Sequence, residues 1–243
     1  MLQDLQKGGL EAINVIDPHS SKAQEIAEEL GIDYHAANPF QSARAINPAK
    51  LGLSGDKAKE VLKRLRPFQE RFVKLKEQKT PHLYLISVDD GTERRVENFI
   101  ERAYLKLPPE EVYALLGYMG KDRVSYTNAL SRFKSFSKIN ESNIDKEGTY
   151  VMIDDMYASG KTTSIVAKIF KDLGAQRVEV WTSHAVTMPM QYLSANERTS
   201  IDKVVSLDTV PQDSRLDIEY INSSADLLTA ELYKTHQKLV ASR

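Results

Sequence analysis

The sequence predicts an α/β fold, a doubly wound and mostly parallel sheet with helices on both faces. Three observations support this prediction. The chain has 243 residues and is 41% apolar, which is enough to bury a substantial core. Short apolar runs rich in β-branched residues alternate with longer stretches of helical period, which is typical of successive βα units. One of these runs ends in adjacent carboxylates, at the edge where open α/β sheets bind ligands.

Six apolar runs are expected to form strands, because each is short and rich in residues that favour extended backbone. In chain order they are AINVI (12–16), HLYLI (82–86), VYALL (112–116), TYVMI (149–153), RVEVWT (177–182) and KVVSL (203–207). We expect them to join one mostly parallel sheet.

Four longer stretches carry apolar residues at spacings of three and four, which predicts amphipathic helices. They are residues 21–30, 94–105, 163–174 and 225–239. Helices between consecutive strands provide the crossovers that a parallel sheet requires.

Two stretches interrupt this alternation. Residues 39–80 are basic and helix-prone, with Pro67 breaking the pattern, and they resemble an insertion. We predict a solvated pair of surface helices there, in preference to an arm that binds nucleic acid. Residues 117–148 are polar, and we predict a mobile functional loop without a long packed element. The whole chain, 1–243, is assigned to a single domain that contains both stretches.

Composition excludes several classes of protein. The 33 Lys and Arg residues balance 34 Asp and Glu residues, so that no basic field indicates a nucleic-acid partner. The absence of Cys excludes disulfides and thiolate zinc sites. No apolar run reaches the ~18 residues of a membrane span, and the first residues lack the pattern of a secretory signal. We therefore expect a cytoplasmic protein without a membrane partner.

The segment TYVMIDDMYASGKTT (149–163) carries the clearest chemical pattern. A buried strand is expected to end at Asp154 and Asp155, whose carboxylates would face solvent and accept hydrogen bonds from the hydroxyls of a ribose. A helix is expected to open at Gly160, with its N-terminus at the same edge of the sheet. Acids facing a phosphate-binding turn suit a sugar phosphate.

The 5′-phosphate of that sugar would be held by backbone amides and hydroxyls in residues 159–163. The expected phosphate-binding residues are Ser159, Gly160, Lys161, Thr162 and Thr163. A P-loop is rejected, because the pattern requires glycine where this chain has Asp155.

This loop resembles the ribose-phosphate loop of the type I phosphoribosyltransferase fold, and the chain resembles more narrowly the ribose-phosphate diphosphokinases (PRPP synthetases). Seven blocks occur in the family's order, and together they extend over nearly the whole chain. They are VIDPHSSKAQ (15–24), ISVDDGTERR (86–95), LLGYMGKDR (115–123), the 149–163 loop, RVEVWTSHAV (177–186), VVSLDTVPQD (204–213) and ADLLTAELYKTH (225–236).

The resemblance implies a transferase of nucleotide biosynthesis that moves a diphosphoryl group from Mg-ATP to the anomeric hydroxyl of ribose 5-phosphate, or of a related acceptor. His19 and Asp89 match positions that place Mg²⁺ and ATP. Lys121 and Arg123 match catalytic residues that clamp the transferring group. His184 matches a histidine to which we assign either a structural role or a role in supporting the site residues. The resemblance also implies a homo-oligomer.

Departures from the family keep two alternatives open. The chain begins where the family's amino-terminal half is nearly over, so that its adenine hairpin and an Arg-Gln pair near ATP have no counterpart here. Within the substrate-binding loop, Ala158 stands where the family has another acid, and Lys161 stands where glycine is usual. These changes resemble phosphoribosyltransferases that consume PRPP, which is the first alternative. The second is a non-catalytic regulatory subunit of a PRPP synthetase complex.

Overall fold

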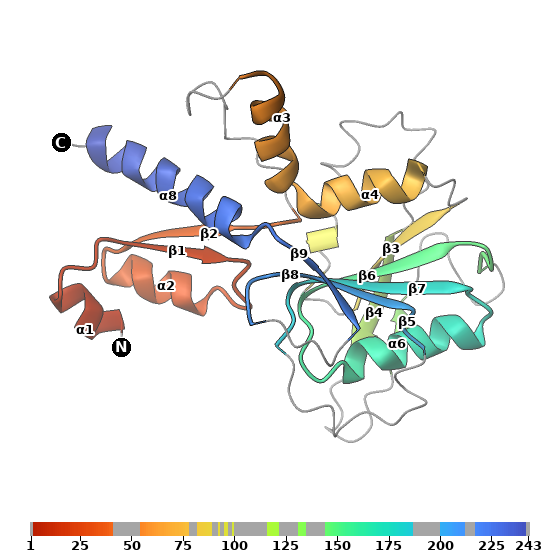
Figure 1. Cartoon of the computed structure of the whole chain (residues 1–243). Coiled ribbons are helices and arrows are strands. Elements are labelled where there is room, and N and C mark those ends of the chain that lie inside the picture. Colours follow the sequence, from red (N-terminus) through yellow and green to blue (C-terminus); the bar gives the residue numbers. More distant parts are fainter. Residues whose placement is uncertain are drawn as a thin grey trace.

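The computed structural model describes residues 2–40, 54–77, 82–88, 92, 95–96, 99, 116–121, 131–134, 144–186, 200–211 and 217–241, with backbone alone at 116–121 and 131–134. Seven strands form one sheet in the order β5-β4-β3-β6-β7-β8-β9 (Figure 1). All neighbours are parallel except β4 and β5. The strands are β3 (Leu83–Ser87), β4 (Leu116–Lys121), β5 (Ser131–Lys134), β6 (Thr149–Met156), β7 (Arg177–His184), β8 (Lys203–Leu207) and β9 (Ile218–Ile221).

A second sheet pairs β1 (Ala12–Ile16) in parallel with β2 (Asp33–Ala37). The helix α2 (Lys22–Glu29) connects the two strands, and α1 (Leu2–Lys7) precedes them. The run 12–16 is therefore a strand as predicted, but it does not join the seven-stranded sheet, so that part of the prediction is wrong.

The long helix α8 (Ser224–Ala241) returns from the seven-stranded sheet and packs along β1 and β2. Thr235 Oγ1 on this helix donates a hydrogen bond to Asn14 Oδ1 at 3.0 Å. At its start, the amides of Ser223 and Ser224 donate to Asp208 Oδ1, at 3.0 and 2.9 Å. The C-terminal helix therefore connects the two sheets.

Helices cover both faces of the seven-stranded sheet, which confirms the doubly wound α/β class. The helix α4 (Pro67–Glu77) lies on one face and α6 (Lys161–Asp172) on the other (Figure 1). Alternate strand residues belong to opposite cores, as the two-residue period of a strand requires. The first core includes Phe68, Phe72, Leu85, Ile153, Trp181 and Val205, and the second includes Ile86, Met152, Val166, Phe170 and Val180.

The predicted helix pair of residues 39–80 corresponds to α3 (Gly55–Arg64) and α4, which meet near Pro67. No residue of α3 is buried, in agreement with a solvated helix. The prediction is wrong for α4, because Phe68 and Phe72 are 0% and 1% exposed against the sheet. Its many charged residues obscure an apolar stripe at helical spacing.

Two strands that were not predicted, β4 and β5, fall largely in the stretch 117–148, where no long packed element is expected. In β4 and β5, Tyr118 pairs with Lys134 and Lys121 with Ser131 in antiparallel register. The two strands are short, six and four residues, so neither is a long packed element, and the functional loop of 117–148 stays a prediction. The other predicted features of 94–105 and 112–116 lie largely outside the described residues.

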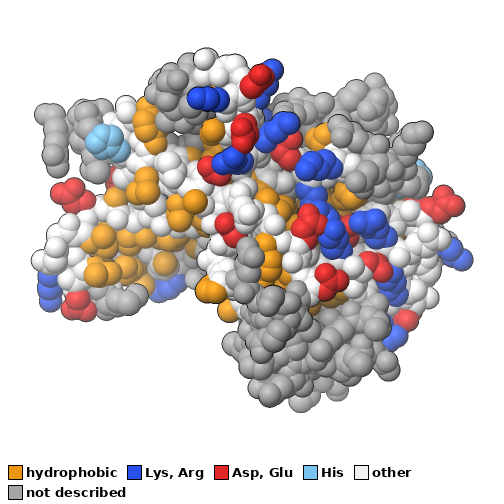
Figure 2. All heavy atoms as spheres, viewed as in Figure 1, with side chains coloured by type: hydrophobic (Ala, Val, Ile, Leu, Met, Phe, Trp, Pro, Cys, Tyr) orange, Lys and Arg blue, Asp and Glu red, His pale blue; other side chains and the backbone are white. Residues whose placement is uncertain are grey.

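The face seen in Figure 2 carries hydrophobic side chains over the part of the molecule that contains β1 and β2. All five residues of β1 are half-buried. Charged side chains of both signs are mixed over the seven-stranded part of the same face. Among the described segments, no helix combines the length and apolar character needed to cross a membrane.

Candidate functional site

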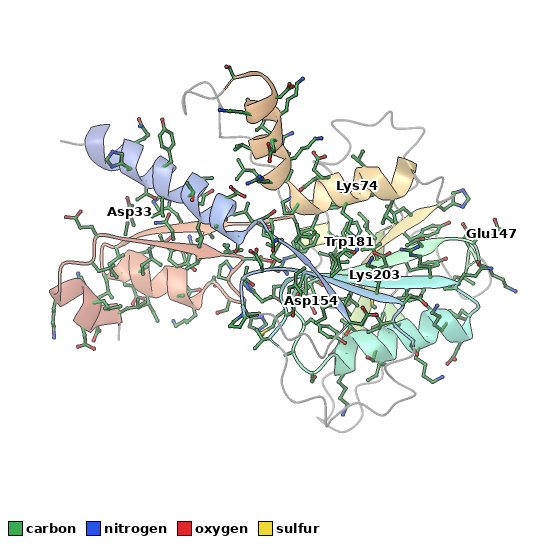
Figure 3. The ribbon with its side chains drawn as sticks, in the orientation of Figure 1. Asp33, Lys74, Glu147, Asp154, Trp181 and Lys203 are labelled. Carbon is green, nitrogen blue, oxygen red and sulfur yellow. The ribbon has the colours of Figure 1, made fainter. Side chains whose placement is uncertain are left out.

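The predicted ribose-phosphate loop connects β6 to α6 in the middle of the larger sheet. Asp154 and Asp155 lie near the carboxyl end of β6, and α6 begins at Lys161. Figure 3 places Asp154 in the region between the two sheets. The strand, turn and helix therefore occur in the order that the sequence predicts.

Gly160 shapes the turn into α6. It is the N-cap residue and has a φ of 68°, in the left-handed region that favours glycine. A Cβ atom at this position would lie 2.6 Å from Tyr157 Oη and 2.8 Å from its Cζ. Glycine is thus required by both backbone conformation and space, and it allows the ring of Tyr157 to lie against the turn.

The first turn of α6 provides donors suited to an anion, because the first amides of a helix have no carbonyl partner within it. The Lys161 amide donates to Ser159 Oγ at 3.3 Å, and the Lys161 side chain is exposed. Ala158, Ser159 and Thr162 are partly exposed. This geometry is compatible with a phosphate at the turn.

Thr163 differs from its predicted role. Its side chain is buried, and its hydroxyl donates to the Gly160 carbonyl at 2.9 Å. That hydroxyl proton therefore closes the first helical turn, so only the backbone of Thr163 could donate to a phosphate.

The acidic pair is asymmetric. Asp155 is 5% exposed, so the expectation that its carboxylate faces solvent is wrong. Asp154 is partly exposed, and its Oδ1 accepts a hydrogen bond from the Asp155 amide at 2.9 Å. Asp155 Oδ2 lies 2.6 Å from Nδ1 of His19. The sequence could not reveal this contact, because His19 follows β1 of the other sheet and is 136 residues from Asp155 in the chain.

The environment of Asp155 favours its ionised form. Burial raises the pKa of this carboxyl group, but hydrogen bonds with Asp154 and His19 and the positive charge of Arg95 outweigh that effect. The net pKa of Asp155 lies below its ordinary value. Asp155 is thus an acceptor at neutral pH.

Residues that were not predicted from the sequence surround the turn before His19. Asp17 accepts hydrogen bonds from Arg95 Nη2, at 2.8 Å, and from the Ser183 hydroxyl. His184 contacts the same turn through the carbonyls of Ile16 and Asp17, at 3.0 and 3.1 Å, in keeping with its predicted structural role. Asp17, Arg95 and Ser183 lie in the family-like blocks, but only the fold brings them together.

Three predicted residues are not tested by these contacts. Asp89 and Arg123 lie outside the described residues. Lys121 is described by its backbone alone, at the end of β4. Their assignments remain predictions.

The acidic pair fits a magnesium ion shared with a substrate better than an ion enclosed by protein. No group of three or more His, Asp or Glu residues within the described ranges could hold a metal. Mg²⁺ is commonly held by one or two carboxylates together with substrate phosphates. Asp154 and Asp155 could supply such carboxylates beside His19.

Comparison with known proteins gives a consistent result. No family model matches the chain. Over 166 residues the chain is 26% identical to "Ribose-phosphate pyrophosphokinase" of Prochlorococcus marinus subsp. pastoris, covering 68% of this chain. The resemblance to ribose-phosphate pyrophosphokinases is confirmed. The match covers 46% of that relative, so the chain spans about half the length of the curated relative it matches.

The fold supports the same resemblance. The crystal structure of phosphoribosylpyrophosphate synthetase from Mycobacterium smegmatis matches with a TM-score of 0.59 and 14% sequence identity. The match covers 97% of this chain and 62% of that chain. The two proteins therefore share a fold over almost the full length of these 243 residues.

Proposed function

We propose that the β6–α6 loop binds ribose 5-phosphate, or a larger molecule that contains this group, and that the protein transfers a diphosphoryl group to it from Mg-ATP. The 2.6 Å contact between His19 and Asp155 carries this proposal. It joins the residue predicted to place ATP with a residue predicted to bind the ribose, although the two come from different sheets.

In this proposal the ribose and its 5′-phosphate bind to different residues of the loop. The ribose hydroxyls donate to Asp154 and Asp155, whose ionised carboxylates are strong acceptors. The 5′-phosphate accepts hydrogen bonds from the first amides of α6, and the exposed side chain of Lys161 adds a positive charge. The buried hydroxyl of Thr163 keeps that turn closed.

In the transfer, the anomeric oxygen of the ribose forms a bond to the β-phosphorus of ATP. The bond from that phosphorus to the oxygen shared with the α-phosphate breaks, AMP leaves with the electron pair, and the hydroxyl proton passes to solvent. Bound Mg²⁺ would neutralise phosphate charge. His19 and Asp89 would place the polyphosphate, and Lys121 and Arg123 would stabilise the transferring group.

A ³¹P NMR assay with ATP, Mg²⁺ and ribose 5-phosphate tests this proposal, and AMP and PRPP are the expected products. Lys121→Ala and Arg123→Ala should each lower turnover by ~10²-fold, as expected for the loss of one charge stabiliser. Lys168→Ala is a matched control, since this exposed lysine of α6 pairs with Asp172. Full turnover in both loop variants would contradict their assigned roles.

A transferase that consumes PRPP is the second candidate, because Ala158 lacks an acid and Lys161 adds a cation to the loop. Its distinguishing product is pyrophosphate, released from PRPP and a purine base in the same NMR assay. Binding of ribose 5-phosphate without turnover, together with copurification of a longer homologue, would instead support the regulatory subunit.

A further inference from the structure

We infer that Asp17 is a positioning residue, which holds the turn after β1 so that the imidazole of His19 stays against Asp155. This inference rests on the proposed function, in which His19 places the polyphosphate. The His19 side chain is 75% exposed, so packing does little to fix its position. Its orientation toward the buried Asp155 therefore depends on the backbone that carries it.

Asp17 is buried and forms hydrogen bonds with both sheets. It is 2% exposed although it carries a carboxylate. Its Oδ1 accepts from Arg95 Nη2 at 2.8 Å, and its Oδ2 accepts from the hydroxyl of Ser183 on β7. Its amide donates to the Ala37 carbonyl of β2 at 2.9 Å. One residue thus connects the smaller sheet to the larger one.

The backbone at Asp17 is held in an unfavourable conformation. Its φ of 39° makes it a non-glycine residue in the left-handed region. Pro18 follows, and a residue before proline normally adopts extended backbone with negative φ. Such a conformation persists where surrounding contacts determine it, and strained residues cluster at functional sites.

His184 supports the same turn from β7. Its Nε2 lies 3.0 and 3.1 Å from the carbonyl oxygens of Ile16 and Asp17, and its Nδ1 lies 2.8 Å from Thr209 Oγ1. The turn is therefore held through both the side chain and the carbonyl of Asp17. Two residues later the chain presents His19 to Asp155.

Ser183→Ala is the primary test, because it removes one hydrogen bond to Asp17 and changes neither Asp17 nor the predicted site. We expect the affinity for magnesium tripolyphosphate, measured by calorimetry, to fall about tenfold, as for the loss of a hydrogen bond to a charged group. The affinity for ribose 5-phosphate should fall less. Ser164→Ala is the matched control, since Ser164 Oγ is buried with no partner among the described residues, and it should change neither affinity.

A double-mutant cycle separates positioning from general destabilisation. If Asp17 acts through His19, Ser183→Ala should have no further effect on tripolyphosphate affinity in a His19→Ala background. Additive losses in the double variant, or equal losses for both ligands, would overturn the inference. Asp17→Asn is the second variant, because asparagine tolerates positive φ, while the charge and one of the two accepting oxygens are lost. It should weaken tripolyphosphate binding more than ribose 5-phosphate binding.

A ligand-independent measurement distinguishes failure of this inference from failure of the proposed function. The ¹⁵N shifts of the His19 ring report its hydrogen bond to Asp155 without any substrate. We expect the bond in the wild type and its loss in Ser183→Ala, with no change in Ser164→Ala. A retained bond in Ser183→Ala overturns the inference. If the shifts change as expected but neither ligand binds the wild type, the proposed function fails and the positioning of His19 stands.

Discussion

Two buried carboxylates on neighbouring strands have opposite kinds of partner. Glu179 on β7 is 0% exposed and bonds to the Trp181 indole, Arg177 and Arg71. Asp155 on β6 is 5% exposed, but its partner His19 is 75% exposed. Two of the three partners of Glu179, Arg71 and the Trp181 indole, pack in the fold, whereas Arg177 is half-exposed. We therefore expect Glu179 to serve mainly stability, and Asp155 to be available to a ligand beside the exposed His19.

The pKa of both carboxylates is lowered for related reasons. Burial raises the pKa of Glu179, but the Trp181 hydrogen bond and the charge of Arg71, together with further hydrogen bonds from both arginines, lower it more strongly. The pKa of Asp155 is lowered instead by hydrogen bonds with Asp154 and His19 and by the charge of Arg95. A shared pKa direction thus does not distinguish the two acids from each other.

The largest expected effect is on stability. Glu179→Ala should lower the free energy of unfolding by about 3–5 kcal/mol, because it leaves the buried Trp181 indole without its acceptor and Arg71 with the partly exposed Glu219 as its remaining acidic partner. Arg71 is 12% exposed and lies 5.5 Å from the ring centre of Trp181. Urea denaturation measures the change. Asp155→Ala should cost clearly less, and equal costs would break the comparison.

The second effect concerns binding. Asp155→Asn should weaken ribose 5-phosphate binding by about tenfold or more, since a charged hydrogen-bond acceptor is lost. Calorimetric titration measures the affinity. Asp172→Asn on α6 is the control, because this exposed aspartate pairs with Lys168 away from the loop. Wild-type affinity in the Asp155 variant would refute the assignment of the ribose site.

The third effect is a pH dependence. The folded pKa of Glu179 is below its ordinary value of 4.5, so this group contributes stability that is present above that value. The contribution is lost as the pH falls through the lowered folded pKa. The stability of wild type should therefore decline more steeply on acidification below pH 4.5 than that of Glu179→Gln, in denaturation series over this range. Parallel declines would mean that Glu179 does not contribute this stability.

The smallest effect should come from Arg177→Ala. Arg177 is 44% exposed. When the Arg177 side chain is removed, Glu179 keeps its hydrogen bonds from Arg71 and Trp181. An ion pair this accessible to solvent is expected to contribute about 0.2–1 kcal/mol. A loss as large as that of Glu179→Ala, measured by the same urea denaturation, would show that Arg177 is the essential partner.

Local features of the fold could be predicted from the sequence. The strand that ends at Asp155, the turn at Gly160 and the helix after it occur where the pattern places them. The break near Pro67 also separates two helices as expected. These features depend on the spacing of apolar residues and on the backbone preferences of neighbouring residues. Neither depends on residues that are distant in the sequence.

Only the tertiary structure shows which residues lie together around His19 and Asp155. His19 and Asp155 are 136 residues apart in the chain, Asp17 and Arg95 are 78 apart, and Asp17 and Ser183 are 166 apart. No local pattern encodes such pairings. The resemblance to a family predicted that His19 and Asp155 are site residues, but it did not indicate the burial of Asp155 or the contacts of Asp17.

The sequence by itself therefore determined the α/β class, the strand–turn–helix at Gly160 and the residues of the turn between β6 and α6, because these follow from local backbone chemistry. Tertiary structure alone decided that β1 forms a second sheet, that α4 covers a core, and that Asp155 is buried against His19. Burial and ion pairing depend on which distant surfaces meet, and that is settled only when the whole chain packs.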